Sequence, residues 1–147
     1  MSLSETTGGT ASAAGRGIEL VRPMLGFPDS TRFSIAPLGV DYEPYAVLSS
    51  LDQPGLEFVV VPPGVLFDDY VIEVPEEDAA ALELTDAADA AVLALVTRRA
   101  TLVPTVNLLG PIVINQQTRR AVQVVLQDDR YGATVPVDAG TSRPSSD

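Results

Sequence analysis

Two groups of neighbouring carboxylates are the residues whose types and spacing could perform chemistry. Asp68 and Asp69 form one group, and Glu76, Glu77 and Asp78 form the other. Paired carboxylates catalyse hydrolysis when they face each other across a substrate and one has a raised pKa. Adjacent residues of a strand point to opposite faces, so Asp68 and Asp69 would not converge there. The triplet is explained without catalysis, because acids at the start of a helix stabilise its dipole.

Residue types that are absent exclude most other active sites. The 147 residues contain no His, Cys or Trp, and all nine basic residues are Arg. This composition excludes Cys/His zinc sites, nucleophiles activated by His, disulfides, and Schiff-base or phosphate-loop lysines. The spacings of calcium loops, nucleophile elbows and dinucleotide-binding glycines are also missing. We therefore expect a protein that is not an enzyme, with no cofactor and no metal; a hydrolase that uses Asp68 or Asp69 is the remaining catalytic alternative.

Acidic residues dominate the charge and are unevenly distributed. Twenty Asp and Glu against nine Arg give a formal charge of −11, which argues against binding to nucleic-acid backbone or to an anionic membrane surface. Thirteen acids and no base lie between Phe33 and Thr97, whereas 98–130 holds five Arg and two Asp, a local charge of +3. Two interpretations remain open: an acidic face that keeps the protein soluble, or one that steers a basic protein partner.

The elements that must position these residues are mainly strands. Apolar and polar residues alternate with period two over 33–37, 45–51, 56–60 and 122–126, which is typical of strands with one buried face. In 45–51, one face carries Tyr45, Val47 and Leu51, and the other carries Ala46, Leu48 and Ser50. The run 91–96 is apolar on both faces and predicts a covered strand, although a buried helix has the same pattern. Turn residues separate these runs at 39–41, 52–55, 62–64 and 110–111.

One short helix is expected near the middle of the chain. Pro75 suits the first helical position, and good helix formers at 79–84 follow the three acids. A further helical turn fits 86–89. Six to nine short strands with one short helix predict a mainly all-β fold, namely a small antiparallel β-barrel-like single domain.

The two ends of the chain differ from this middle part. Residues 1–17 and 138–147 are rich in small and polar types and predict flexible tails around a domain at 18–137. The first residues lack the basic and apolar regions of a secretory signal. No apolar run approaches the roughly 18 residues of a membrane-spanning helix. The lack of cysteine is compatible with a reducing compartment.

One segment has a recognisable pattern. Residues 105–115, with the sequence TVNLLGPIVIN, resemble the hallmark TxNLxxPIVIN of the flagellar assembly factor FliW family. Further features follow in the order and spacing of that family: Gly26-Phe27-Pro28, Arg32-Phe33, Pro44-Tyr45, 56–62, Phe67-Asp68-Asp69-Tyr70, Thr118-Arg119 and Tyr131. The resemblance spans about 18–136.

The resemblance implies a non-enzymatic, cytoplasmic regulator with a small β-barrel-like fold. Such a protein binds the flagellin subunit and, once flagellin has been exported, binds the RNA-binding translational repressor CsrA. The flagellin level then controls flagellin translation, without direct contact of the regulator with nucleic acid or membrane. The alternative is an acidic β-barrel that acts only as a flagellin or export chaperone and has no effect on translation.

Six residues are candidates for partner contact: Asp68, Asp69, Tyr70, Glu73, Asn107 and Arg119. The three acids are the preferred acidic contacts. Tyr70 lies in the core or anchors a partner. Asn107 either hydrogen-bonds the backbone of the turn before Gly110-Pro111 or contacts a partner. Arg119 points away from the face of Arg120 and is the freer of the two, and Asn115 is expected in a hairpin turn.

Overall fold

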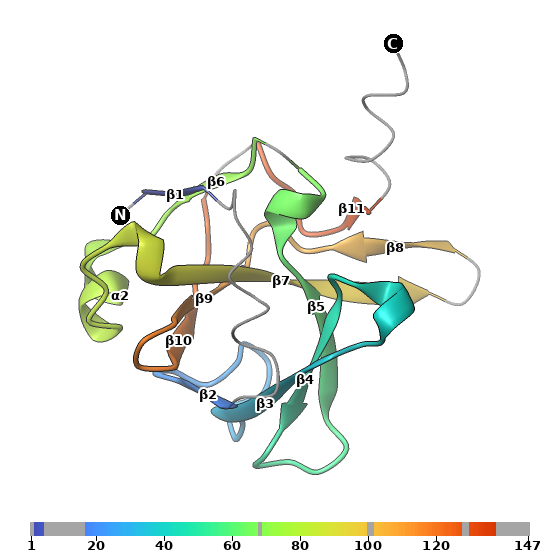
Figure 1. The fold of residues 1–147 in the computed structure, drawn as a ribbon, viewed down its shortest axis with the longest axis horizontal. Coiled ribbons are helices and arrows are strands. Elements are labelled where there is room, and N and C mark those ends of the chain that lie inside the picture. Colours follow the sequence, from blue (N-terminus) through green and yellow to red (C-terminus); the bar gives the residue numbers. More distant parts are fainter. Residues whose placement is uncertain (1, 5–16, 68, 100–101, 128–129, 138–147) are drawn as a thin grey trace.

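Seven strands close into a barrel in the computed structural model of this chain, which describes residues 2–4, 17–67, 69–99, 102–127 and 130–137 (Figure 1). In barrel order the strands are β7 (Ala90–Arg99), β5 (Glu57–Val61), β4 (Ala46–Ser50), β3 (Arg32–Pro37), β2 (Gly17–Leu20), β10 (Arg120–Gln123) and β9 (Ile112–Asn115). Pairing of β9 with β7 closes the ring. Neighbours are antiparallel except β2 and β10, which are parallel. The predicted all-β barrel is confirmed.

Shorter strands lie outside the ring. β8 (Leu102–Val106) pairs with the second half of β7, and β11 (Val135–Pro136) pairs with β8. β1 (Ser2–Ser4) and β6 (Val71–Glu73) form a separate antiparallel pair. The described residues thus contain eleven strands, more than the six to nine expected, because strands of two or three residues are too short to show alternation.

The predicted tails are only partly described. The tail expected over 1–17 begins with β1, and its last residue, Gly17, starts β2. Residues 5–16 and 138–147 lie outside the described residues.

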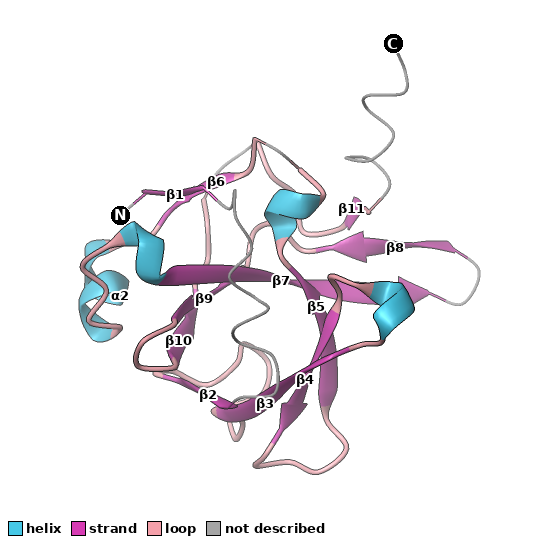
Figure 2. Cartoon of the chain, viewed as in Figure 1, coloured by secondary structure: helices cyan, strands magenta, loops and turns pink. Residues whose placement is uncertain are grey.

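Helical segments are short and lie outside the barrel wall (Figure 2). They are α2 (Glu76–Ala81) and the single turns η1 (Val40–Tyr42), η2 (Pro63–Val65) and η3 (Ala87–Asp89). Pro75 is the N-cap of α2 and not its first helical residue, so the helix begins one residue later than predicted. Asp86 caps η3 by accepting a hydrogen bond from the Ala88 amide at 3.0 Å, where a helical turn was expected. Among the described helices none has the length and hydropathy needed to cross a membrane.

The register of β4 determines which of its two faces is buried. Phe33 and Ile35 of β3 are buried, and they stand opposite Ser50 and Leu48 of β4. Residues directly opposite in a sheet share a face, so Leu48 and Ser50 also point into the barrel. The buried face is therefore the one that begins at Ala46, and Leu51 is 55% exposed.

An inner core fills the barrel. Its buried members come from all seven strands and from the loop after β2: Ile18, Leu20, Met24, Phe33, Ile35, Ala46, Leu48, Val60, Ala91, Leu93, Ile112, Ile114 and Ala121. Phe27 and Phe58 close one side of it with an edge-on ring contact, their centroids 5.2 Å apart. Because the alternate residues of each strand point inward, the period-two pattern of the sequence is explained by this core.

An outer core covers one side of the barrel. It joins the outward residues of β7, β9 and β10 to the segment that carries η2, β6 and α2, and its largest members are Tyr70, Phe67, Leu66, Ile72, Leu82, Leu84 and Leu108. Along β7 the residues alternate between the cores, with Leu93 inside and Val92 and Ala94 outside. The prediction that 91–96 forms a strand covered on both faces is confirmed.

Candidate functional site

The acidic candidates do not gather into a catalytic pair. Asp68 lies outside the described residues, whereas Asp69 and Glu73 are exposed, the first in a turn and the second on β6. In the described part of the chain, no group of three or more Asp, Glu, His or Cys side chains could hold a metal ion. Asp78 differs from its neighbours in the triplet, because it is buried and accepts a hydrogen bond from Arg22 Nη1 at 2.8 Å. It therefore ties α2 to the segment after β2, while Glu76 and Glu77 are exposed.

Tyr70 lies in the outer core and not on the surface. It is 2% exposed, and its hydroxyl donates to the carbonyl oxygen of Leu108 at 2.6 Å. Its ring meets that of Tyr131 at 4.6 Å between centroids. The Tyr131 hydroxyl in turn bonds both the amide and the carbonyl of Val71, each at 3.0 Å. The interpretation of Tyr70 as a core residue is therefore correct. The alternative, that it contacts a partner, is wrong, because a partner cannot reach this side chain in this fold.

Asn107 organises the turn in the middle of the hallmark segment. Its Oδ1 accepts hydrogen bonds from the amides of Leu109 and Gly110, at 2.9 and 3.1 Å. A Cβ at Gly110 would lie 3.1 Å from Gln123 Nε2 and 3.3 Å from Asn107 Nδ2, so the close approach favours glycine. The turn role predicted for Asn107 is confirmed, and a contact with a partner stays a prediction.

Asn115 holds two elements together at the other end of this segment. It is buried at the end of β9, where its Oδ1 accepts from the Gln117 amide at 2.9 Å, as the predicted hairpin turn requires. Its Nδ2 donates to the carbonyl of Leu82 at 2.8 Å, which satisfies a terminal carbonyl of α2. This second bond could not be predicted from the sequence, since its partner lies 33 residues away. Both asparagines thus have structural roles.

The two arginines after β9 have the opposite of their expected roles. Arg119 precedes β10 with a backbone φ of 66°, and its Nε donates to the carbonyl of Gly17 at 3.2 Å. Arg120, the first residue of β10, is the more exposed of the two. The prediction that Arg119 is the freer residue is wrong, because the left-handed turn directs its side chain back onto the barrel.

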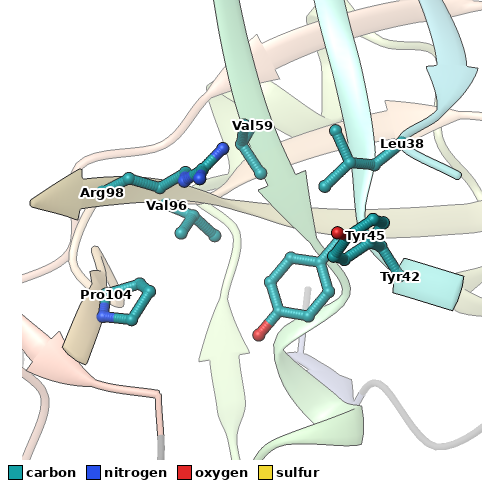
Figure 3. Close-up of a pocket in the computed structure, with 7 residues that line it drawn as sticks. All are labelled: Leu38, Tyr42, Tyr45, Val59, Val96, Arg98 and Pro104. Carbon is teal, nitrogen blue, oxygen red and sulfur yellow. The ribbon is translucent and has the colours of Figure 1, made fainter. Parts of the chain in front are cut away.

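A groove that the sequence did not predict opens where the outer core ends (Figure 3). Its volume is about 370 Å³, and it is lined by Leu38, Tyr42, Tyr45, Val59, Val96, Arg98 and Pro104. Val59 and Val96 form a cross-strand pair between β5 and β7, and this is the last pair recorded between those strands. Figure 3 shows Arg98 and Pro104 on one side of the groove and the two tyrosines on the other.

A β-bulge shapes the side that carries Arg98. β7 and β8 pair at Thr97–Thr105 and again at Arg99–Leu102, so Arg98 alone stands opposite Val103 and Pro104. An extra residue of this kind redirects side chains and increases the local twist. Proline has no N–H for the ladder and is tolerated at such an irregularity. Pro104 inside an apolar strand was the one sequence signal that could have indicated it.

The polar groups of the groove are hydrogen-bond donors. Arg98 is exposed, and within the described part of the chain no ion pair is recorded for it. Burial raises the pKa of Tyr45 above its ordinary value of 10.0, at which a phenol is already protonated at neutral pH. The other lining residues offer apolar surface, apart from the phenol of Tyr42.

These features define a class of protein: a small closed β-barrel in which the two asparagines of the hallmark segment hydrogen-bond the backbone of the fold. Comparison with known proteins identifies the family. The family described as "FliW protein" matches residues 3–137, and the chain belongs to the FliW family.

Relatives agree with this assignment. The chain is 36% identical over 127 residues to the flagellar assembly factor FliW of Natranaerobius thermophilus, covering 80% of each chain. It is 34% identical over 113 residues to that of Bacillus subtilis, covering 76% of this chain and 78% of the other. A crystal structure of the flagellar assembly factor FliW superposes with a TM-score of 0.75 at 27% identity, over 82% of this chain and 84% of that one. These relatives are described as flagellar assembly factors.

Proposed function

We propose that this protein is a cytoplasmic flagellar assembly factor that binds flagellin and antagonises the translational repressor CsrA. Free flagellin occupies the protein; when flagellin is exported, the protein binds the repressor and weakens its hold on flagellin message. The observation that carries this proposal is membership of the FliW family over residues 3–137.

The charge of the surface supports a basic partner. The formal charge is −11, and around α2 the side chains of Glu73, Glu76, Glu77, Glu83 and Asp86 are exposed. A repressor that binds RNA presents a basic surface. Opposite charges accelerate encounter, so an acidic surface here would raise the association rate.

The test uses the flagellin and CsrA of the same organism. Calorimetry should show a complex with each protein, and a gel-shift assay should show release of CsrA from the flagellin leader RNA as the protein is added. Prior addition of flagellin should suppress that release. Binding to neither protein would sink the proposal, and flagellin binding without release of RNA would leave only the chaperone function.

A matched pair of variants tests the acidic surface. E76Q/E77Q removes two charges from α2, and D41N/E43Q removes two from η1 and the residue after it, on the far side of the molecule (Figure 1). We expect the first variant to slow association with CsrA severalfold at low salt and the second to have little effect. Equal rates for the two variants would show that α2 does not steer the encounter.

A further inference from the structure

The groove beside Arg98 has a chemistry opposite to that of the acidic surface. Its floor is the Val59–Val96 pair, and Leu38 and Pro104 add apolar surface. Apolar side chains that gather on a surface with a polar edge mark an interaction site more often than scattered ones do.

Arg98 determines the charge that this groove accepts. It is exposed, and no side chain of the described residues forms an ion pair with it. None of the seven described lining residues is an acid, and Arg98 stands with Pro104 on the side of the groove opposite the two tyrosines (Figure 3). A guanidinium next to apolar surface favours a carboxylate, which it can hold through two parallel hydrogen bonds.

The exposure of the groove favours a protein segment over a small molecule. Sites for small ligands bury most of the ligand surface, but Tyr42 is 61% exposed and Arg98 is also exposed. Tyrosine and arginine are the residue types enriched where proteins bind one another tightly. One arginine in the groove of a chain with a charge of −11 does not suit a nucleic-acid backbone.

We propose that this groove docks an extended segment of a partner protein that carries a leucine- or phenylalanine-sized side chain next to a carboxylate. The apolar side chain covers Val59 and Val96 between the two tyrosines and Pro104, and the carboxylate binds the Arg98 guanidinium. Tyr45 donates a hydrogen bond to the segment from its protonated phenol. The bulge at Val103 and Pro104, which stands opposite Arg98, holds Arg98 at the rim. This inference does not depend on the proposed function, since it requires neither flagellin nor CsrA.

The experiment selects the segment directly from random sequences. A displayed library of random heptapeptides is panned on the full-length protein, and the enriched peptides are synthesised with a fluorescent label for anisotropy measurements. We expect enriched peptides to place Leu, Ile or Phe beside Asp or Glu. Failure to enrich any peptide, or enrichment of basic peptides, would overturn the proposal.

Variants then locate the binding. Arg98→Gln should weaken binding of the selected peptide about ten- to a hundredfold, because the carboxylate loses a charged hydrogen-bond partner. Arg98→Lys should weaken binding less. Tyr42→Ala should also weaken it, because part of the apolar wall is removed. Arg120→Gln, which removes an exposed arginine elsewhere, is the matched control and should change nothing. A peptide that binds the Arg98→Gln and Tyr42→Ala proteins as tightly as the parent would contradict the assignment.

Discussion

The outer face of the barrel has a covered half and an open half. On β7, β9 and β10 the outward residues Val92, Ala94, Val113 and Val122 are buried under the segment that carries β6 and α2. On β3 and β4 the outward residues Ser34, Val47 and Ser49 are only half-buried, and Val47 is not among the described hydrophobic residues that pack against the outer core. The same kind of strand is therefore apolar on both faces in one half and alternating in the other.

The difference shows how polar side chains are used in each half. In the covered half, Asn115 and Tyr131 donate to backbone carbonyls of the covering segment, and Tyr70 of that segment donates to the carbonyl of Leu108. Such bonds matter because a buried polar group without a partner costs free energy. In the open half the polar side chains can be solvated, and the groove lies where the cover stops. Cover and docking surface thus occupy separate parts of one barrel.

Truncation of a covering side chain should have the largest effect. Leu82 is fully buried in the outer core, so Leu82→Ala should lower the free energy of unfolding by about 2–5 kcal/mol. Leu51→Ala, on an exposed leucine after β4, should change it by less than about 0.5 kcal/mol. Urea denaturation measures both values. Similar values for the two variants would mean that packing in the outer core does not stabilise the fold.

Loss of one hydroxyl in the covered half should have a smaller effect. Tyr70→Phe removes the 2.6 Å bond to the Leu108 carbonyl and leaves that buried acceptor without this donor, at an expected cost of about 1–2 kcal/mol. Tyr42→Phe in the open half serves as the control and should be close to neutral, since that side chain is mostly exposed. Equal stability of the Tyr70→Phe protein and the parent would show that this hydrogen bond does not stabilise the covered half.

A charge in the open half should produce the smallest effect, one that is present near neutral pH and lost in acid. Asp52 accepts hydrogen bonds from the amides of Thr31 and Arg32 and from the Arg32 guanidinium. These bonds, the Thr31 amide first, lower the pKa of Asp52 from 3.8 to about 2. A pKa lower in the folded state means that the stabilisation is complete above about pH 4 and is lost as the pH falls toward 2.

The comparison of wild type with Asp52→Asn measures this loss. The melting temperatures of the two proteins should differ near neutral pH and converge between pH 4 and 2. A difference that stays constant down to pH 2 would contradict the lowered pKa.

Local patterns were enough to predict much of the fold. Alternation located β3, β4 and β5, and the doubly apolar run located β7, because each pattern reflects burial of one or two faces. The buried face of β4 could not be predicted, since it depends on pairing with Phe33 and Ile35 of another strand. β6 and β11 have too few residues to carry a period.

The candidate site was less accessible to sequence reasoning. Asn107 was correctly placed in a turn because its bonds reach only two and three residues along the chain. The bonds of Arg119 and Asn115 reach 102 and 33 residues, and no local pattern contains that information. The groove depends on a bulge between β7 and β8 and on residues from four separate segments, so only the folded chain reveals it.

The parallel pair of β2 and β10 has a consequence for the order in which the chain can fold. Its hydrogen bonds join Glu19 to Arg119 and Val21 to Ala121, a separation of 100 residues in each case. A ribosome releases β2 long before β10, so the ring stays open with two bare strand edges until β9 and β10 have been synthesised. Contacts between residues so far apart in the sequence form slowly, and unpaired strand edges can pair with other nascent chains. The barrel therefore closes late during folding, and the chain is most prone to aggregate before it closes.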